Sequence, residues 1–144
     1  MDLAYELHDL VRTLDKWAER ILRPEGLSYN RYVALVIVSE HPGMTGRELA
    51  GALGVTEAAS SGIVRSLLDA GLFEDLAPSG TGNVRLLGVT KRGTILLGHC
   101  SALLGSSLDD NATAIGIDPH GLARTIHALH DEVRTVRSPS QSAE

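Results

Sequence analysis

The chain has 144 residues, a hydrophobic fraction of 43% and a formal net charge of −5, which fit one globular domain and exclude a disordered or strongly basic protein. Its single cysteine excludes an internal disulfide framework. The sequence shows neither a secretory leader nor a run of about 18 apolar residues. We therefore expect a reduced, cytoplasmic setting and no membrane partner.

Residues 1–23 predict one long amphipathic helix. Its apolar residues alternate at steps of four and three, the heptad spacing that packs one helix against another: Leu3, Leu7, Leu10, Leu14, Trp17 and Ile21. Pro24 and Gly26 end this helix. A second helix is expected over residues 28–40, before the stop sequence His41-Pro42-Gly43, although its β-branched residues would also suit a strand.

Residues 44–72 predict a helix-turn-helix. Thr45 can cap the first helix, and Glu48, three residues later, completes a capping box. Gly54 suits the left-handed residue that ends this helix, and Thr56 can cap the next one. A short helix, a glycine-containing turn and a second helix are typical of a DNA-binding motif whose second helix enters the major groove.

A β-hairpin is expected directly after this motif. Residues 72–77 and 84–89 predict two strands, and the segment from Pro78 to Asn83 has the composition of a turn. A hairpin in this position is a wing, which normally lies beside the recognition helix and approaches the neighbouring minor groove or the DNA backbone.

The last third of the chain predicts a helix from Thr90 to about Leu108, a break over 109–116 and a final helix from Asp118-Pro119 to about Arg137. The final helix carries a second heptad-like stripe: Leu122, Ile126, Leu129, Val133 and Val136. Residues 138–144 have the composition of a disordered tail. Stripes at both ends of the chain favour a homodimer, and packing of these helices on each other within one chain is the alternative.

This order of elements resembles the MarR family of bacterial transcription regulators over nearly the whole chain. Three segments carry the resemblance: Gly43-Met44-Thr45 followed by Glu48-Leu49-Ala50, the recognition helix ending in Gly71-Leu72, and Val89-Thr90-Lys91-Arg92-Gly93. The resemblance implies a mainly α fold, which is an α+β winged helix-turn-helix of about six helices and a two-stranded wing. We expect a single domain over 1–144, with a winged head at 28–93 and dimerisation helices at 1–23 and 94–137.

The resemblance implies a DNA-binding transcription regulator, a homodimer that represses from a pseudo-palindromic operator and is released by a small ligand. Three departures concern charge. Thr81-Gly82-Asn83 stands where the family wing usually carries an arginine, Glu74-Asp75 replaces Glu-Arg, and Gly62 and Ser66 occupy positions that are commonly basic. Between Gly43 and Thr94, five basic and five acidic residues leave a net charge of zero. A protein-interaction module with weak or lost DNA binding is therefore an alternative.

The candidate DNA-binding residues belong to the helix-turn-helix and the wing: Thr45, Arg47, Thr56, Ser60, Ser61, Arg65, Asn83 and Arg85. Arg65 would contact a phosphate or pair with guanine, and the alternative is a solvated ion pair with Asp69 four residues on. The serines suit phosphates or base edges, or are simply exposed. Gly62 either lets the backbone approach DNA closely or is a tolerated glycine.

The family places its effector between the dimerisation helices and the head, which implies five candidates for a small aromatic or anionic ligand: His8, Arg12, Trp17, Tyr32 and His99. Six histidines leave a metal-sensing regulator as a further alternative, although no Cys/His pair has the spacing of a zinc site. Cys100 is expected to be a buried, inert thiol. Because the sequence lacks motifs of catalytic and cofactor sites, we expect neither an enzyme nor a cofactor.

Overall fold

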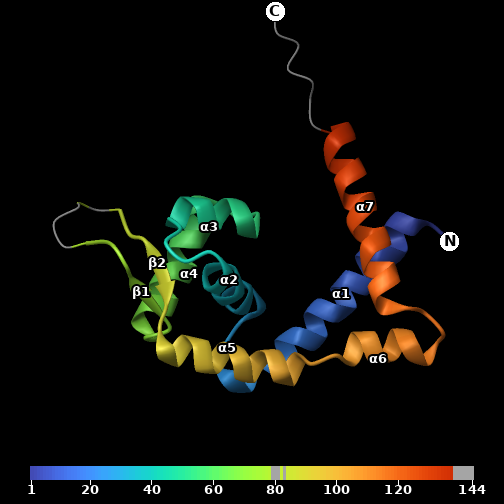
Figure 1. The fold of residues 1–144 in the computed structure, drawn as a ribbon, viewed down its shortest axis with the longest axis horizontal. Helices are drawn as coiled ribbons and strands as arrows, with labels where there is room; N and C mark the ends of the chain where they lie inside the picture. The colour runs from blue at the N-terminus through green and yellow to red at the C-terminus, as the bar shows by residue number, and fades with distance from the viewer. Residues whose placement is uncertain (79–81, 83, 138–144) are drawn as a thin grey trace, which may run out of the picture. The chain divides into compact units, whose positions relative to one another are not determined.

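The computed structural model describes residues 1–78, 82 and 84–137 (Figure 1). Within them the chain forms seven α-helices, one 3-10 turn (η1) and two strands: α1 Leu3–Leu22, η1 Arg23–Glu25, α2 Tyr29–Glu40, α3 Gly46–Leu53, α4 Glu57–Asp69, β1 Phe73–Asp75, β2 Leu87–Val89, α5 Lys91–Leu104, α6 Ser107–Ala114 and α7 Pro119–Arg137. They fall into two compact units, with α1 to α5 in the first and α6 and α7 in the second. The predicted class, a mainly helical winged helix-turn-helix, is confirmed.

The core of the first unit is aliphatic and is built around α2. Ala34, Leu35 and Val38 of this helix are completely buried, and α1, α3, α4, α5 and β2 all pack against it. Leu49 of α3 and Leu67 of α4 enter the same cluster. Burial of these side chains, each about 1.5–3 kcal/mol, holds the helix-turn-helix to the rest of the unit.

The wing is shorter than the sequence predicts. β1 and β2 are antiparallel and pair Phe73 with Val89 and Asp75 with Leu87. Beyond this pair the Leu76 N–H still donates to the Leu86 carbonyl at 2.7 Å, but the Leu86 N–H donates to Oδ1 of Asp75, 3.1 Å away, and the regular pairing ends there. The opposite side of β2 is bridged to Met44, just before α3, which ties the wing to the start of the helix-turn-helix.

The expected break over 109–116 is wrong in part, because most of it lies in α6. That helix is polar and exposed, so it lacks the apolar periodicity from which a helix is predicted. Asp109 and Asp110 in its first turn complement the positive end of the helix dipole. Gly105 and Gly116, both with positive φ, flank it, and the preceding helix α5 therefore ends at Leu104 and not at Leu108.

The second unit leaves its apolar stripe uncovered. α7 begins as predicted, with the Asp118 carboxylate accepting hydrogen bonds from the backbone N–H groups of His120 and Gly121. Its five heptad-like residues, from Leu122 to Val136, are 38–71% exposed. The predicted tail at 138–144 lies outside the described residues. In the part of the chain that the structure describes, no helix is long and apolar enough to cross a membrane.

Candidate nucleic-acid interface

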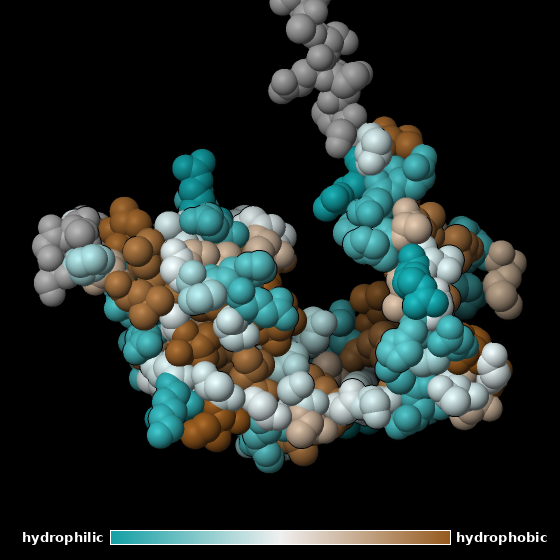
Figure 2. All heavy atoms as spheres, viewed as in Figure 1, coloured by the Kyte–Doolittle hydropathy of each residue, from teal (hydrophilic) through white to brown (hydrophobic). Residues whose placement is uncertain are grey.

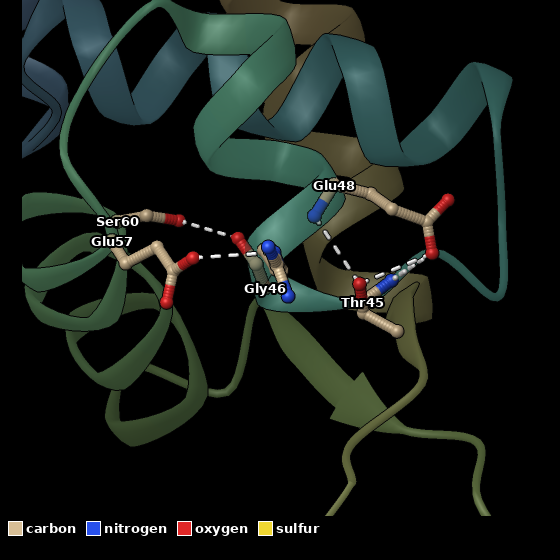
Figure 3. Close-up of polar contacts among 6 residues, drawn as sticks. Thr45, Gly46, Glu48, Glu57 and Ser60 are labelled. Carbon is tan, nitrogen blue, oxygen red and sulfur yellow. Dashed lines mark hydrogen bonds and ion pairs between the residues drawn. The ribbon is translucent and has the colours of Figure 1, made fainter.

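Two threonines fix where the helices of the helix-turn-helix begin, and Figure 3 shows the first of them, Thr45. Thr45 and Glu48 form the predicted capping box: the Thr45 hydroxyl accepts from the Glu48 N–H at 3.2 Å, and the Glu48 carboxylate accepts from the Thr45 N–H at 3.3 Å. Thr56 accepts from the Ala59 N–H at 3.1 Å. Gly54, with φ of 69°, ends α3 as predicted. Both threonine side chains therefore serve as helix caps.

Ser60 does not lie on the outer face of α4, which corrects its prediction as a DNA contact. The residue is 1% exposed, and its hydroxyl donates to the Gly46 carbonyl of α3 at 3.0 Å (Figure 3). Ser60 shares the buried face of α4 with Val64 and Leu67, four and seven residues further on. It therefore joins the N-terminal ends of α3 and α4 and is covered by them.

Arg47 lies at the exposed start of α3, as predicted, but it has a partner there. Its Nε is 3.3 Å from Oε1 of Glu57, the first residue of α4. The two side chains are 86% and 70% exposed, so the pair contributes little to stability and is open to ligands. The pair and the Ser60 hydrogen bond together place the starts of both helices on one surface.

A groove of about 610 Å³ separates α4 from the wing. The start of α3 and the middle of α4 supply one wall and the wing supplies the other: Thr45, Gly46, Ser61, Val64 and Arg65 face Asp75, Gly82, Val84, Arg85 and Leu87. The structure thus brings together Thr45, Ser61, Arg65 and Arg85 from the predicted set. Arg65 forms no ion pair with Asp69, and among the described residues neither Arg65 nor Arg85 has an ionic partner. The predicted Asn83 lies outside the described residues.

Six groove residues were not predicted from the sequence: Gly46, Val64, Asp75, Gly82, Val84 and Leu87. Gly46 reaches the groove because the Met44–Leu87 bridge draws the start of α3 to the wing, and local patterns contain no sign of that bridge. Asp75 shapes the opposite wall, since its Oδ1 accepts from the N–H groups of Ala77 and Leu86. Val84 is more than half exposed, and Figure 2 shows apolar surface on this part of the wing.

The structure does not gather the five predicted effector residues in one cavity. Arg12 lies in a hollow of about 430 Å³ along α1. Charged neighbours of Arg12 line this hollow, and none of the other four candidates is among its lining residues. His8 is exposed, whereas Trp17 and Tyr32 are half-buried, Tyr32 against the core. His99 of α5 lies 3.2 Å from the Glu25 carboxylate of η1.

Comparison with known proteins shows which family this arrangement resembles. Residues 27–74, which span α2, the helix-turn-helix and the start of the wing, match the family model described as MarR family. A MarR family protein of Mycobacterium tuberculosis in complex with DNA is 25% identical, with a TM-score of 0.73 over 90% of this chain and 98% of that one. The chain is therefore similar to the MarR family over about a third of its length.

Further solved structures share the MarR fold. The M. tuberculosis MarR family protein in complex with p-aminosalicylic acid is 26% identical, with a TM-score of 0.68 over 92% of this chain and 98% of that one. A mutant MarR from E. coli in complex with operator DNA is 21% identical, with a TM-score of 0.74 over 91% and 92% of the two chains, a likeness of fold alone. No curated protein sequence matches the chain. MarR family proteins are transcription regulators and not enzymes, and residues 27–74 of this chain resemble them.

The only cysteine of this chain is buried in the core, as predicted. Burial raises the pKa of the Cys100 thiol, and the negative charge of Glu25 raises it further. Both effects disfavour the thiolate, which is the nucleophilic form. The structure therefore supports the expectation of an inert thiol.

Proposed function

We propose that the chain is a homodimeric repressor that binds a pseudo-palindromic DNA operator and is released by a small aromatic anion. The groove between α4 and the wing carries the proposal. One arginine from each wall, Arg65 and Arg85, faces it without an ionic partner among the described residues, against a single carboxylate from Asp75. A DNA backbone strand lying in this groove would place α4 in the major groove and the wing over the minor groove.

The proposed contacts follow from the positions of the side chains. Arg65 and Arg85 would neutralise phosphates along the groove, and Ser61 would donate a hydrogen bond from the exposed face of α4. Arg47 can reach the adjacent phosphate, because its pair with Glu57 uses Nε and leaves its terminal nitrogens for DNA. Thr45 and Thr56 would contribute through the helix N-termini that they cap.

The exposed apolar stripes support the homodimer. In the first unit, Leu3, Leu10 and Val11 of α1 are 44–63% exposed, and the stripe of α7 in the second unit is also uncovered. Faces of this kind are covered in a closed two-fold dimer, whose two heads then meet two operator half-sites. We assign residues 28–93 to the winged head and residues 1–23 and 94–137 to dimerisation.

The ligand class is proposed from chemistry and from the M. tuberculosis relative. That protein has been solved with salicylic acid and with p-aminosalicylic acid, at 26% identity to this chain. Arg12 supplies a cation for a carboxylate, and Trp17 and Tyr32 offer half-buried aromatic faces. We retain His8, Arg12, Trp17, Tyr32 and His99 as the proposed effector residues, to be brought together in the dimer.

The test combines three measurements on the full chain. Gel shift at low salt with DNA from upstream of its own coding sequence should give a discrete complex. Light scattering should give twice the mass of 15.3 kDa, and salicylate should dissociate the complex. A dimer that shifts no DNA even at low salt would contradict the proposal.

That same result would favour a protein-interaction module, for which the zero net charge over residues 43–94 and the exposed apolar side chains of the wing also speak. Metal sensing has no comparable support. Within the described ranges, no group of three or more His, Cys, Asp or Glu side chains is placed to hold a metal ion.

A further inference from the structure

We infer that Glu57 is a specificity-determining residue that selects a cytosine in each operator half-site by accepting a hydrogen bond from its N4 amino group. This inference rests on the proposed DNA binding and concerns a residue outside the contacts proposed above. It comes from an acidic side chain at the position of the recognition helix where base contacts are made.

The position of Glu57 is fixed by its own helix, α4, and by a contact from α3. Thr56 caps α4, so that Glu57 is the first residue of the helix, and the N-terminal residues of a recognition helix are those that contact base edges. Arg47 holds the carboxylate from the side of α3 at 3.3 Å. The Ser60 hydroxyl fixes the distance between the two helix starts through the Gly46 carbonyl. Because the Glu57 side chain is 70% exposed, its second oxygen remains accessible.

A carboxylate at this position is unfavourable near phosphates, so it needs a hydrogen-bond donor on the DNA. In the major groove those donors are the amino groups of cytosine N4 and adenine N6. Adenine also presents its N7 acceptor beside N6, and two acceptors repel each other, whereas cytosine presents the donor alone. The carboxylate therefore favours cytosine. Arg47 reduces the repulsion, since its positive charge lies 3.3 Å from the Glu57 carboxylate.

A purely structural role for Glu57 makes a different prediction. An acid in the first turn stabilises α4 through the helix dipole, and it pairs with Arg47 whatever the DNA sequence. In that case neutralising Glu57 would remove a repulsive charge, and every DNA sequence would bind more tightly by the same factor.

The test is a binding selection from a random duplex library, with wild type, Glu57→Gln and Glu57→Ala. Asp69→Asn is the matched control, since Asp69 is exposed at the far end of the same helix and its change in charge is equal. For wild type we expect one position per half-site to prefer cytosine by roughly tenfold. Glu57→Gln should transfer the preference to adenine, because an amide pairs with N6 and N7. Glu57→Ala should abolish the preference there, and Asp69→Asn should retain it.

Two outcomes would overturn the inference. One is a cytosine preference that survives in both Glu57 variants, and the other is uniformly tighter binding with unchanged sequence preference. If wild type itself selects no DNA, the proposed function fails, and this inference fails with it. That failure shows before any variant is examined. Circular dichroism melting of each variant verifies that α4 is intact.

Discussion

Two neighbouring serines of α4 offer a sharp test of the interface, because the structure gives them opposite roles. Ser60 is buried and donates to the Gly46 carbonyl, whereas Ser61 is exposed in the groove. Ser60→Ala removes one intramolecular hydrogen bond, which costs about 1 kcal/mol, and alanine returns a few tenths through its helix propensity. We expect a net loss of about 0.5–1 kcal/mol, or a fall in melting temperature of about 2–4 °C for a chain of this size.

Ser61→Ala should behave in the opposite way. Its effect on the free energy of unfolding should stay within about 0.5 kcal/mol, since the hydroxyl is on the surface. Each half-site would lose one contact worth about 1 kcal/mol, so that operator binding by the dimer weakens roughly 30-fold. Thermal melting and fluorescence anisotropy with labelled operator measure the two effects. Loss of DNA affinity in Ser60→Ala with an unchanged melting temperature would refute this assignment of roles.

Three further predictions concern charge, backbone and pH. Arg65→Ala should lower the slope of log K against log salt by about 0.9 per lost phosphate contact, or about 1.8 per dimer, and an unchanged slope would exclude a phosphate contact. Gly93→Ala should cost about 3 kcal/mol in urea unfolding, because its Cβ would clash with the Leu72 carbonyl oxygen. Gly98→Ala, whose Cβ would meet open space, is the control, and equal stabilities of the two variants would contradict the predicted clash. The raised pKa of Cys100 keeps the folded thiol protonated where the unfolded one ionises, so its contribution to stability is complete below the ordinary value of 9.0 and declines at higher pH. Urea midpoints of wild type and Cys100→Ala should therefore converge as the pH rises above 9.0, and parallel curves would contradict this.

The helix starts could be predicted because their signals are local. Thr45, Glu48 and Thr56 cap the helices within three residues of themselves, so the sequence alone identifies them. The orientation of α4 was harder to predict. Ser60 was predicted on the face toward DNA, but the structure buries it together with Val64 and Leu67. The spacing of these three residues is helical, and only the polar side chain of Ser60 concealed it.

The wing and the effector residues depended on contacts that local patterns do not contain. Asp75 was interpreted as an acid in place of a base, whereas it closes the hairpin by accepting two backbone N–H groups. Met44 was assigned to the start of the helix-turn-helix, and its bridge to Leu87 joins residues more than 40 positions apart. Long-range pairings of this kind are set by the packing of the whole unit, which short-range periodicity does not encode.

The neutral charge of the head underestimates its attraction for DNA, because net charge is a property of the sequence and binding depends on where the charges lie. Two of the acidic residues that bring the net charge of the head to zero have partners at the helix starts. Glu48 is held in a capping box, and Glu57 is paired with Arg47. The groove itself is lined by Arg65 and Arg85 against Asp75 alone, a local balance of two cations to one anion. Phosphates in the groove would meet that local excess within a Debye length of about 10 Å, and more distant surface acids would be screened. DNA binding through few phosphate contacts, with a shallow dependence on salt, is therefore the behaviour to expect of this head.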